Sequence, residues 1–169
     1  KGDYAYTLVR QYLFDEAEQV RLHALTKSSY TPIKEAAAKI VREEAYHLMH
    51  TKSLLERLGD ATEESHRRMQ AALDAAFPQA RGMFEKLHSE DDLVAAGVFP
   101  GNDSLNAEWL SKAVPVLKNA TLNVSMSGGA DEGGRGHGGV PRGRHGGPRG
   151  ALGDRHAAHG LRGDIELAR

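Results

Sequence analysis

The stretch from Thr31 to Leu58 constrains the fold more than any other part of the sequence. Steps of three and four residues trace one helix face that is apolar at both ends and polar in the middle. A carboxylate and an imidazole within such a face must be paired, hydrogen-bonded or bound to metal. The positions on this face are Ile33, Ala37, Ile40, Glu44, His47, Thr51, Leu55 and Leu58.

The same periodicity predicts further helices and an all-α chain. The expected helices cover 3–27, 31–58, 62–88 and 104–118, within one helical domain over 1–127. The connection between the first two is so short that they must be antiparallel neighbours. Segment 88–103, which is rich in acids and contains Pro100, is expected to be a loop.

Helix ends can be assigned from local chemistry. Thr31 can cap the second helix, and Gly59 suits a left-handed stop at its end. Thr62 or Asp60 can cap the third helix. Pro78 lacks the backbone N–H that a helix interior needs, so it is expected to kink or break that helix.

Charge and composition exclude several function classes. The formal net charge of the 169 residues is -1, which gives no electrostatic case for binding nucleic acid or an anionic membrane. No apolar run approaches the roughly 20 residues of a membrane-spanning helix. The chain has no cysteine, so it has no disulfide or thiol nucleophile, and a cytoplasmic location is expected.

The last segment, 128–169, differs in composition from the rest. It holds most of the 19 glycines and is rich in Arg and His, with few large apolar residues. Such a segment cannot bury enough surface to order itself. We therefore expect a disordered Gly/Arg-rich tail.

Two interpretations of the polar centre are open. In the first, Glu44 and His47 form a metal half-site with Glu16 of the preceding helix, because ferritin-like bundles hold di-iron or di-manganese centres with Glu-x-x-His motifs. A full site of that kind takes four carboxylates and two histidines from four helices. In the second interpretation, which we favour, no metal is bound and a buried polar network occupies the centre. Its members would be Asp15, Glu43, Tyr46 and His47.

Several sequence blocks resemble the structural (PaaC-type) subunit of the bacterial phenylacetyl-CoA epoxidase. They cover Arg10–Asp15, Ala38–Leu48, Leu55–Asp60, Met69–Ala72 and Ala120–Val124. The resemblance implies a ferritin-like helical bundle and membership of a multicomponent oxygenase of aerobic phenylacetate catabolism. It further implies that a sister subunit holds the di-iron centre and binds the CoA thioester. The PaaC-type subunit would itself hold no cofactor and act as a scaffold.

The sequence departs from that family in three ways. Family members begin with another helical pair, so we expect a truncated bundle with exposed apolar surface and a tendency to self-associate. They usually carry apolar or small residues where Glu16 and Glu44 stand here, whereas Asp15, Glu43, Tyr46 and His47 match. They end in a last helix, and we hypothesise that the segment after about Ser127 is a frameshifted reading of it.

Three functions follow as hypotheses. The chain is a non-catalytic structural subunit of the epoxidase, binding its di-iron catalytic subunit. Alternatively, it is a stand-alone ferritin-like di-iron or di-manganese protein that dimerises to complete a site from Glu16, Glu44 and His47. The third hypothesis is a helical interaction module with no link to an enzyme.

Overall fold

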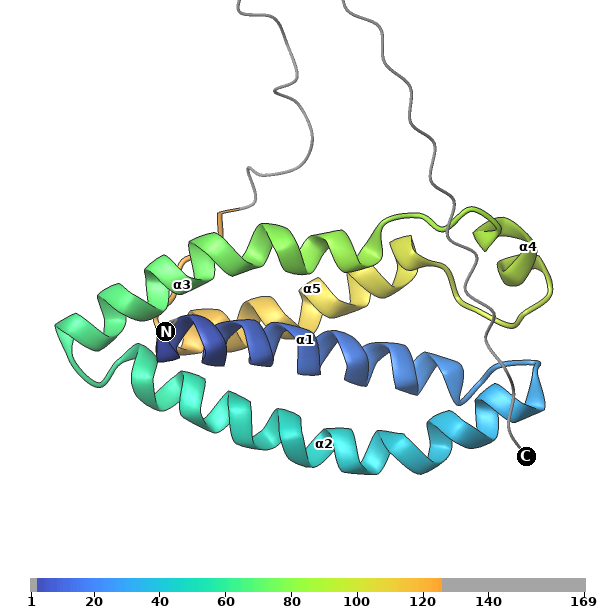
Figure 1. The fold of residues 1–169 in the computed structure, drawn as a ribbon, viewed down its shortest axis with the longest axis horizontal. Coiled ribbons are helices and arrows are strands. Elements are labelled where there is room, and N and C mark those ends of the chain that lie inside the picture. The colour runs from blue at the N-terminus through green and yellow to red at the C-terminus, as the bar shows by residue number, and fades with distance from the viewer. Residues whose placement is uncertain (1–2, 126–169) are drawn as a thin grey trace, which may run out of the picture. The chain divides into compact units, whose positions relative to one another are not determined.

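A computed structural model describes residues 3–125, and this part of the chain contains helices and no strand (Figure 1). This confirms the all-α prediction. Predictions for 128–169, including disorder and the frameshift, lie outside the described residues. Within 3–125 no helix has the length and apolarity that crossing a membrane requires. The helices are α1 (Tyr4–Leu25), α2 (Thr31–Gly59), α3 (Glu63–Arg81), α4 (Glu90–Ala95) and α5 (Asn102–Asn119), with a 3-10 turn η1 at Gly82–Phe84.

Helix α1 is the centre of the bundle. It contacts α2, α3 and α5, and Figure 1 shows α2 and α3 on opposite sides of it. Its apolar residues face all three neighbours, so a single helix supplies much of the core. Those with no exposed surface are Val9, Tyr12, Leu13, Ala17 and Val20.

Trp109 of α5 joins three helices in the core. Its ring stacks on Phe77 of α3, with the centroids 5.5 Å apart, and lies 5.2 Å from the ring of Phe84. Its indole N–H donates a hydrogen bond of 3.1 Å to the carbonyl oxygen of Leu13 in α1. The indole is fully buried, so its one polar atom needs this partner.

Some helix boundaries differ from those predicted. Helix α3 ends at Arg81 rather than near residue 88, and it passes through Pro78 without a break. The carbonyl group of Asp74 loses its N–H partner because proline has no N–H. Asp74 and Pro78 are both exposed, so this carbonyl group lies near water. Tyr30, and not Thr31, is the N-cap of α2, and no side chain caps it. The Thr62 hydroxyl caps α3 as predicted, accepting from the Ser65 amide at 3.1 Å.

The segment expected to be a loop contains the short helix α4. The Glu90 carboxylate is buried and accepts hydrogen bonds from the backbone amides of Leu87, at 3.0 Å, and Asn102, at 2.7 Å. These two bonds lower the pKa of Glu90. The Glu90 carboxylate thus links the two ends of the segment, at Leu87 and Asn102. The periodicity of apolar residues does not indicate this contact.

Gly59 is predicted to end α2 in the left-handed conformation, but the structure requires a glycine there because of a close contact. It is the last residue of α2 and does not adopt the left-handed conformation. Ala120, just after α5, lies directly against it: a Cβ on Gly59 would overlap the Ala120 carbonyl oxygen and lie 2.9 Å from the Ala120 Cβ. The glycine therefore allows the end of α2 to touch the end of α5.

Gly59→Ala is expected to lower the free energy of unfolding by about 1–3 kcal/mol, because the added methyl group must push the backbone of Ala120 aside. Urea unfolding followed by circular dichroism measures this loss. Ser53→Ala, at an exposed position of the same helix, is the control. A Gly59→Ala protein as stable as the control would show that the two helix ends do not meet.

Candidate functional site

Asp15 is the buried polar centre between α1 and α2. Only 3 % of its surface is exposed. The Thr51 hydroxyl donates a hydrogen bond of 3.0 Å to one carboxylate oxygen, and the Gln11 amide donates to the other. These bonds compensate the carboxylate for the water it loses on burial.

The other members predicted for a buried network are on the surface. Tyr46 is 73 % exposed, and Glu43 and His47 are also exposed, so this prediction is wrong for all three. Helix residues advance by about 100° each, and positions seven apart therefore share a side. The side of α2 that faces α1 carries Ala37, Glu44 and Thr51, with Leu48 and Leu55 beside them. Tyr46 is on the opposite side of the helix, and His47 is about a quarter turn from the side that faces α1.

Glu44 and His47 form a side-chain pair, but the pair is at the surface and not in the core. Their carboxylate and Nδ1 atoms are 3.3 Å apart, with 67 % of the His47 side chain exposed and 16 % of that of Glu44. An ion pair at such an exposed position contributes little to stability. We conclude that this pair is a surface feature of α2.

Glu16, the next residue along α1, has different surroundings from Asp15. It is buried on the side of α1 that faces α5 and α2, where burial raises its pKa and the charges of Lys112 and Lys52 partly offset that rise. Burial likewise raises the pKa of the neighbouring Tyr12 hydroxyl, and Glu16 adds to this effect. Between residues 3 and 125, no three His, Asp or Glu side chains come together as metal ligands. The predicted half-site of Glu16, Glu44 and His47 is therefore not assembled within the described chain.

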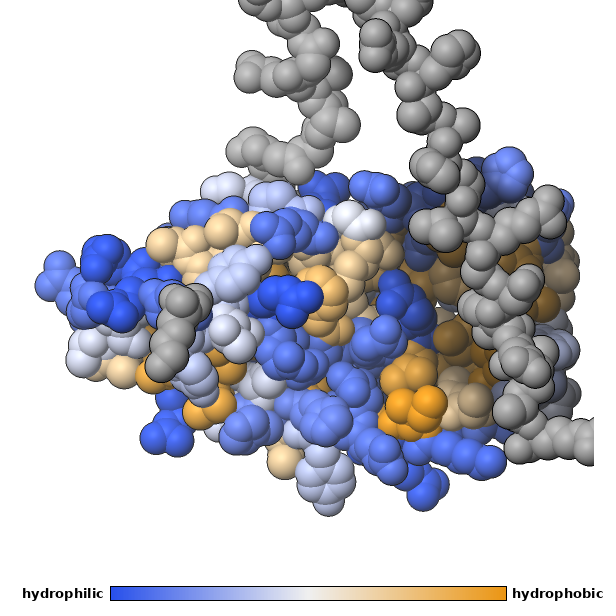
Figure 2. Space-filling model, in the orientation of Figure 1, coloured by the Kyte–Doolittle hydropathy of each residue, from blue (hydrophilic) through white to orange (hydrophobic). Residues whose placement is uncertain are grey.

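A surface face of apolar residues lies along α1 and α2. Figure 2 shows orange, apolar residues gathered between the C-terminal half of α1 and the neighbouring part of α2. Ile40 is 47 % exposed, and Leu22, Leu25 and Ile33 are partly exposed and do not pack against the main core. We call these four residues the α1/α2 apolar face. The exposed apolar surface expected on these helices is thus present.

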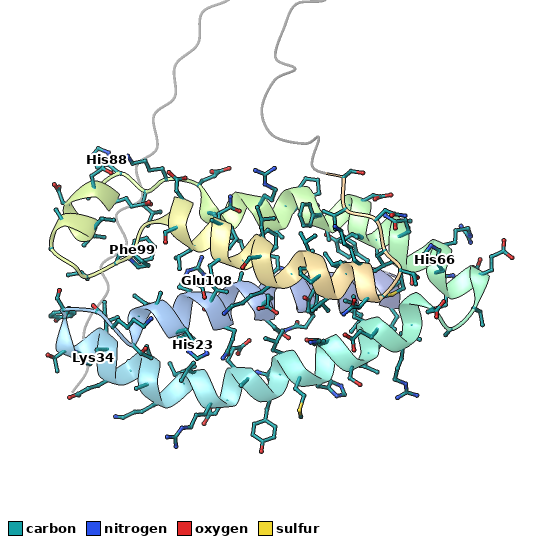
Figure 3. All side chains as sticks on the ribbon, turned by 180° about the vertical axis from the view of Figure 1, so that it is seen from behind. His23, Lys34, His66, His88, Phe99 and Glu108 are labelled. Atoms are coloured by element: carbon teal, nitrogen blue, oxygen red, sulfur yellow. The ribbon has the colours of Figure 1, made fainter. Side chains whose placement is uncertain are left out.

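A pocket of about 400 Å³ opens at the other end of the bundle from the Gly59–Ala120 contact. His23 and Lys27 line it from the end of α1, and Ser104 and Glu108 from α5. Figure 3 shows His23, Phe99 and Glu108 at this end of the bundle. The loop between α4 and α5 supplies its apolar wall. Sequence analysis missed this pocket. The one available signal was the spacing of His23 and Lys27, four residues apart on one helix side, which does not reveal what lies opposite.

Comparisons with known proteins agree on one family. Residues 1–145 match the family described as phenylacetic acid catabolic protein. The chain is similar to the C subunit of the 1,2-phenylacetyl-CoA epoxidase of Escherichia coli (strain K12), with 28 % identity over 134 residues. The alignment covers 79 % of this chain and 54 % of the relative, so the chain spans about half the length of the curated relative.

Thr51→Val should destabilise the fold by about 1–3 kcal/mol, because it removes a hydrogen-bond donor from a buried carboxylate while keeping the side-chain shape. His47→Ala should change stability by no more than about 0.5 kcal/mol, since the imidazole is on the surface. Chemical denaturation of both variants gives the comparison. If His47→Ala proves as costly as Thr51→Val, the imidazole takes part in the core after all.

Glu16→Gln is expected to raise the free energy of unfolding at pH 7. The folded pKa of Glu16 is raised, so the folded state loses stability as the pH rises from the unfolded value of about 4.3 through the folded pKa. The amide carries no charge, and its advantage should disappear below about pH 4.

Urea unfolding at pH 4 and pH 7 measures this difference. Glu18→Gln, on the exposed side of the same helix, is the control. A Glu16→Gln protein that is equally stable relative to the parent at both pH values would contradict a raised pKa.

Proposed function

Because the chain belongs to the phenylacetic acid catabolic protein family, we propose that it is a non-catalytic structural subunit of a phenylacetyl-CoA epoxidase. In this proposal it binds and stabilises the di-iron catalytic subunit, which carries out the oxygen chemistry in the cytoplasm. The name of the relative, the C subunit of that epoxidase, supports the assignment. The pathway in this proposal is aerobic phenylacetate catabolism, which agrees with the description of the family.

The observation that carries the proposal is the α1/α2 apolar face. Apolar side chains left partly in water on two adjacent helices favour binding to another protein surface. Ile40 is the most exposed of the four residues, and the charged residues Glu43 and Glu44, three and four positions further along α2, are its neighbours on the helix surface. An apolar centre with a charged rim is the usual composition of a protein–protein interface.

The polar residues of the bundle support a structural rather than a catalytic role. Asp15 is engaged by Thr51 and Gln11, and within residues 3–125 Glu16 does not come together with Glu44 and His47 as a group of metal ligands. The dinuclear chemistry of the complex is assigned to the partner subunit.

Ile40→Glu should reduce capture of the catalytic subunit by about tenfold or more, because it places a charge within the apolar face. The test co-expresses the full 169-residue chain with a tagged catalytic subunit of a phenylacetyl-CoA epoxidase and measures the ratio of the two after purification. Tyr46→Glu is the matched control, since Tyr46 is an exposed apolar residue on the opposite side of α2.

Absence of capture of the parent chain would contradict the proposed function. Iron or manganese bound in stoichiometric amount to the chain purified alone would favour a stand-alone metalloprotein instead. Capture that Ile40→Glu leaves undiminished would show that binding does not use the apolar face.

A further inference from the structure

We propose that the pocket between the end of α1, the α4–α5 loop and α5 binds a small organic acid, with its carboxylate at Lys27 and its apolar body against the loop. This inference does not rest on the proposed function. The pocket and the α1/α2 apolar face share none of their residues.

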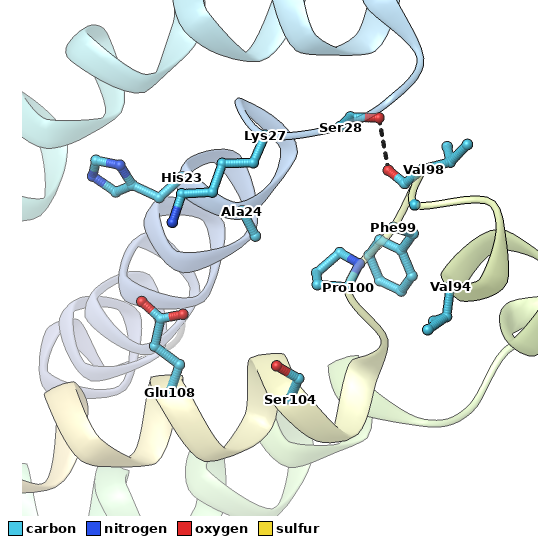
Figure 4. A pocket seen from close by; sticks show the side chains of 11 residues that line it. His23, Ala24, Lys27, Ser28, Val94, Val98, Phe99, Pro100, Ser104 and Glu108 are labelled. Atoms are coloured by element: carbon cyan, nitrogen blue, oxygen red, sulfur yellow. Dashed lines mark hydrogen bonds between the residues drawn. The ribbon is translucent and has the colours of Figure 1, made fainter.

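The two walls of the pocket differ in chemistry. Figure 4 shows Val98, Phe99, Pro100 and Val94 on one side, and the charged ends of Lys27 and Glu108 on the other. The volume of about 400 Å³ lies within the range of small-molecule sites, roughly 300–1,000 Å³. A ligand that fills it must therefore be amphipathic, with an apolar body and one polar end.

The free charge in the pocket is positive. Glu108 forms an ion pair of 2.9 Å with Lys112, so its carboxylate already has a cationic partner on α5. Within the described residues, no carboxylate lies at ion-pair distance from the Lys27 ammonium. Lys27 can therefore donate charge-assisted hydrogen bonds to an anion, and the Ser104 hydroxyl, which lines the pocket from α5, offers a further donor.

His23 and its neighbour complete the polar side. The Nε2 atoms of His23 and Gln19 are 2.9 Å apart, so the Gln19 amide holds the imidazole at the edge of the pocket. Gln19 itself is buried and is not among the residues that line the pocket, so it acts on the site through His23.

The apolar wall is held in place without a ligand. The Ser28 hydroxyl donates a hydrogen bond of 2.8 Å to the carbonyl oxygen of Val98, drawn in Figure 4. The Ser29 amide and hydroxyl donate to the carbonyl oxygens of Gly97, at 2.9 Å, and Ala96, at 2.7 Å. These bonds tie the α4–α5 loop to the α1–α2 connection. Because the wall is preformed, binding need not order the loop.

Hexanoate is the probe for this site. Two related compounds separate the contribution of the carboxylate to binding from that of the apolar body. Acetate has the carboxylate without the apolar body, and hexanamide has the apolar body without the charge. The full chain is titrated with each compound, and binding is followed by NMR chemical shifts and isothermal titration calorimetry. We expect hexanoate to bind at least about tenfold more tightly than either acetate or hexanamide.

Two variants test the location. Lys27→Ala should weaken hexanoate binding by about tenfold or more, whereas Lys34→Ala, an exposed lysine of α2 outside the pocket, should leave it unchanged. Ser104→Phe fills the pocket from an exposed position, so it should abolish binding while the helical circular dichroism signal is kept. Hexanoate binding that is absent, equal to that of hexanamide, or unaffected by both Lys27→Ala and Ser104→Phe would overturn the proposal.

Discussion

The indole of Trp109 holds together the three helices on which every other feature depends. Its stacking on Phe77 and its hydrogen bond to the Leu13 carbonyl fix α3 and α5 against α1. With those helices and α2 in place, α1 is enclosed along most of its length. A helix enclosed in this way cannot turn or slide without opening the core, because interiors are packed to crystal-like density.

This enclosure decides the environment of each polar residue on α1. Asp15 meets Thr51 because α2 lies on that side of the helix, and Glu16, one residue later, lies nearer to α5, where the charges of Lys112 and of Lys52 from α2 act on it. His23 and Lys27 lie past the enclosed part of α1, so they reach a pocket and solvent. The adjacent carboxylates Asp15 and Glu16 therefore differ in role: one is fully hydrogen-bonded, and the other is held in a region where burial disfavours its charge.

The proposed protein partner and the proposed small ligand bind to different kinds of surface on the same bundle. The α1/α2 apolar face is apolar surface that packing within the described chain leaves uncovered, and such surface favours a protein partner. The pocket beside Lys27 has one wall formed by a loop that hydrogen bonds already hold, and it favours a small ligand. Because neither set of residues supports the other, a second protein and a small acid could bind to the chain independently.

The sequence by itself determined the helices, their order and much of the core. The periodicity of Thr31–Leu58 predicts α2, Leu55 and Trp109 are buried as their patterns indicate, and the Thr62 cap is where its chemistry places it. Only the tertiary structure decided which flank of a helix is covered. Periodicity defines a stripe to within about one residue, or 100°, so His47 could be placed in the core or outside it until the position of α1 was known. The contact of Gly59 with Ala120 and the pocket depend on residues far apart in the chain, and local patterns carry no information about such contacts.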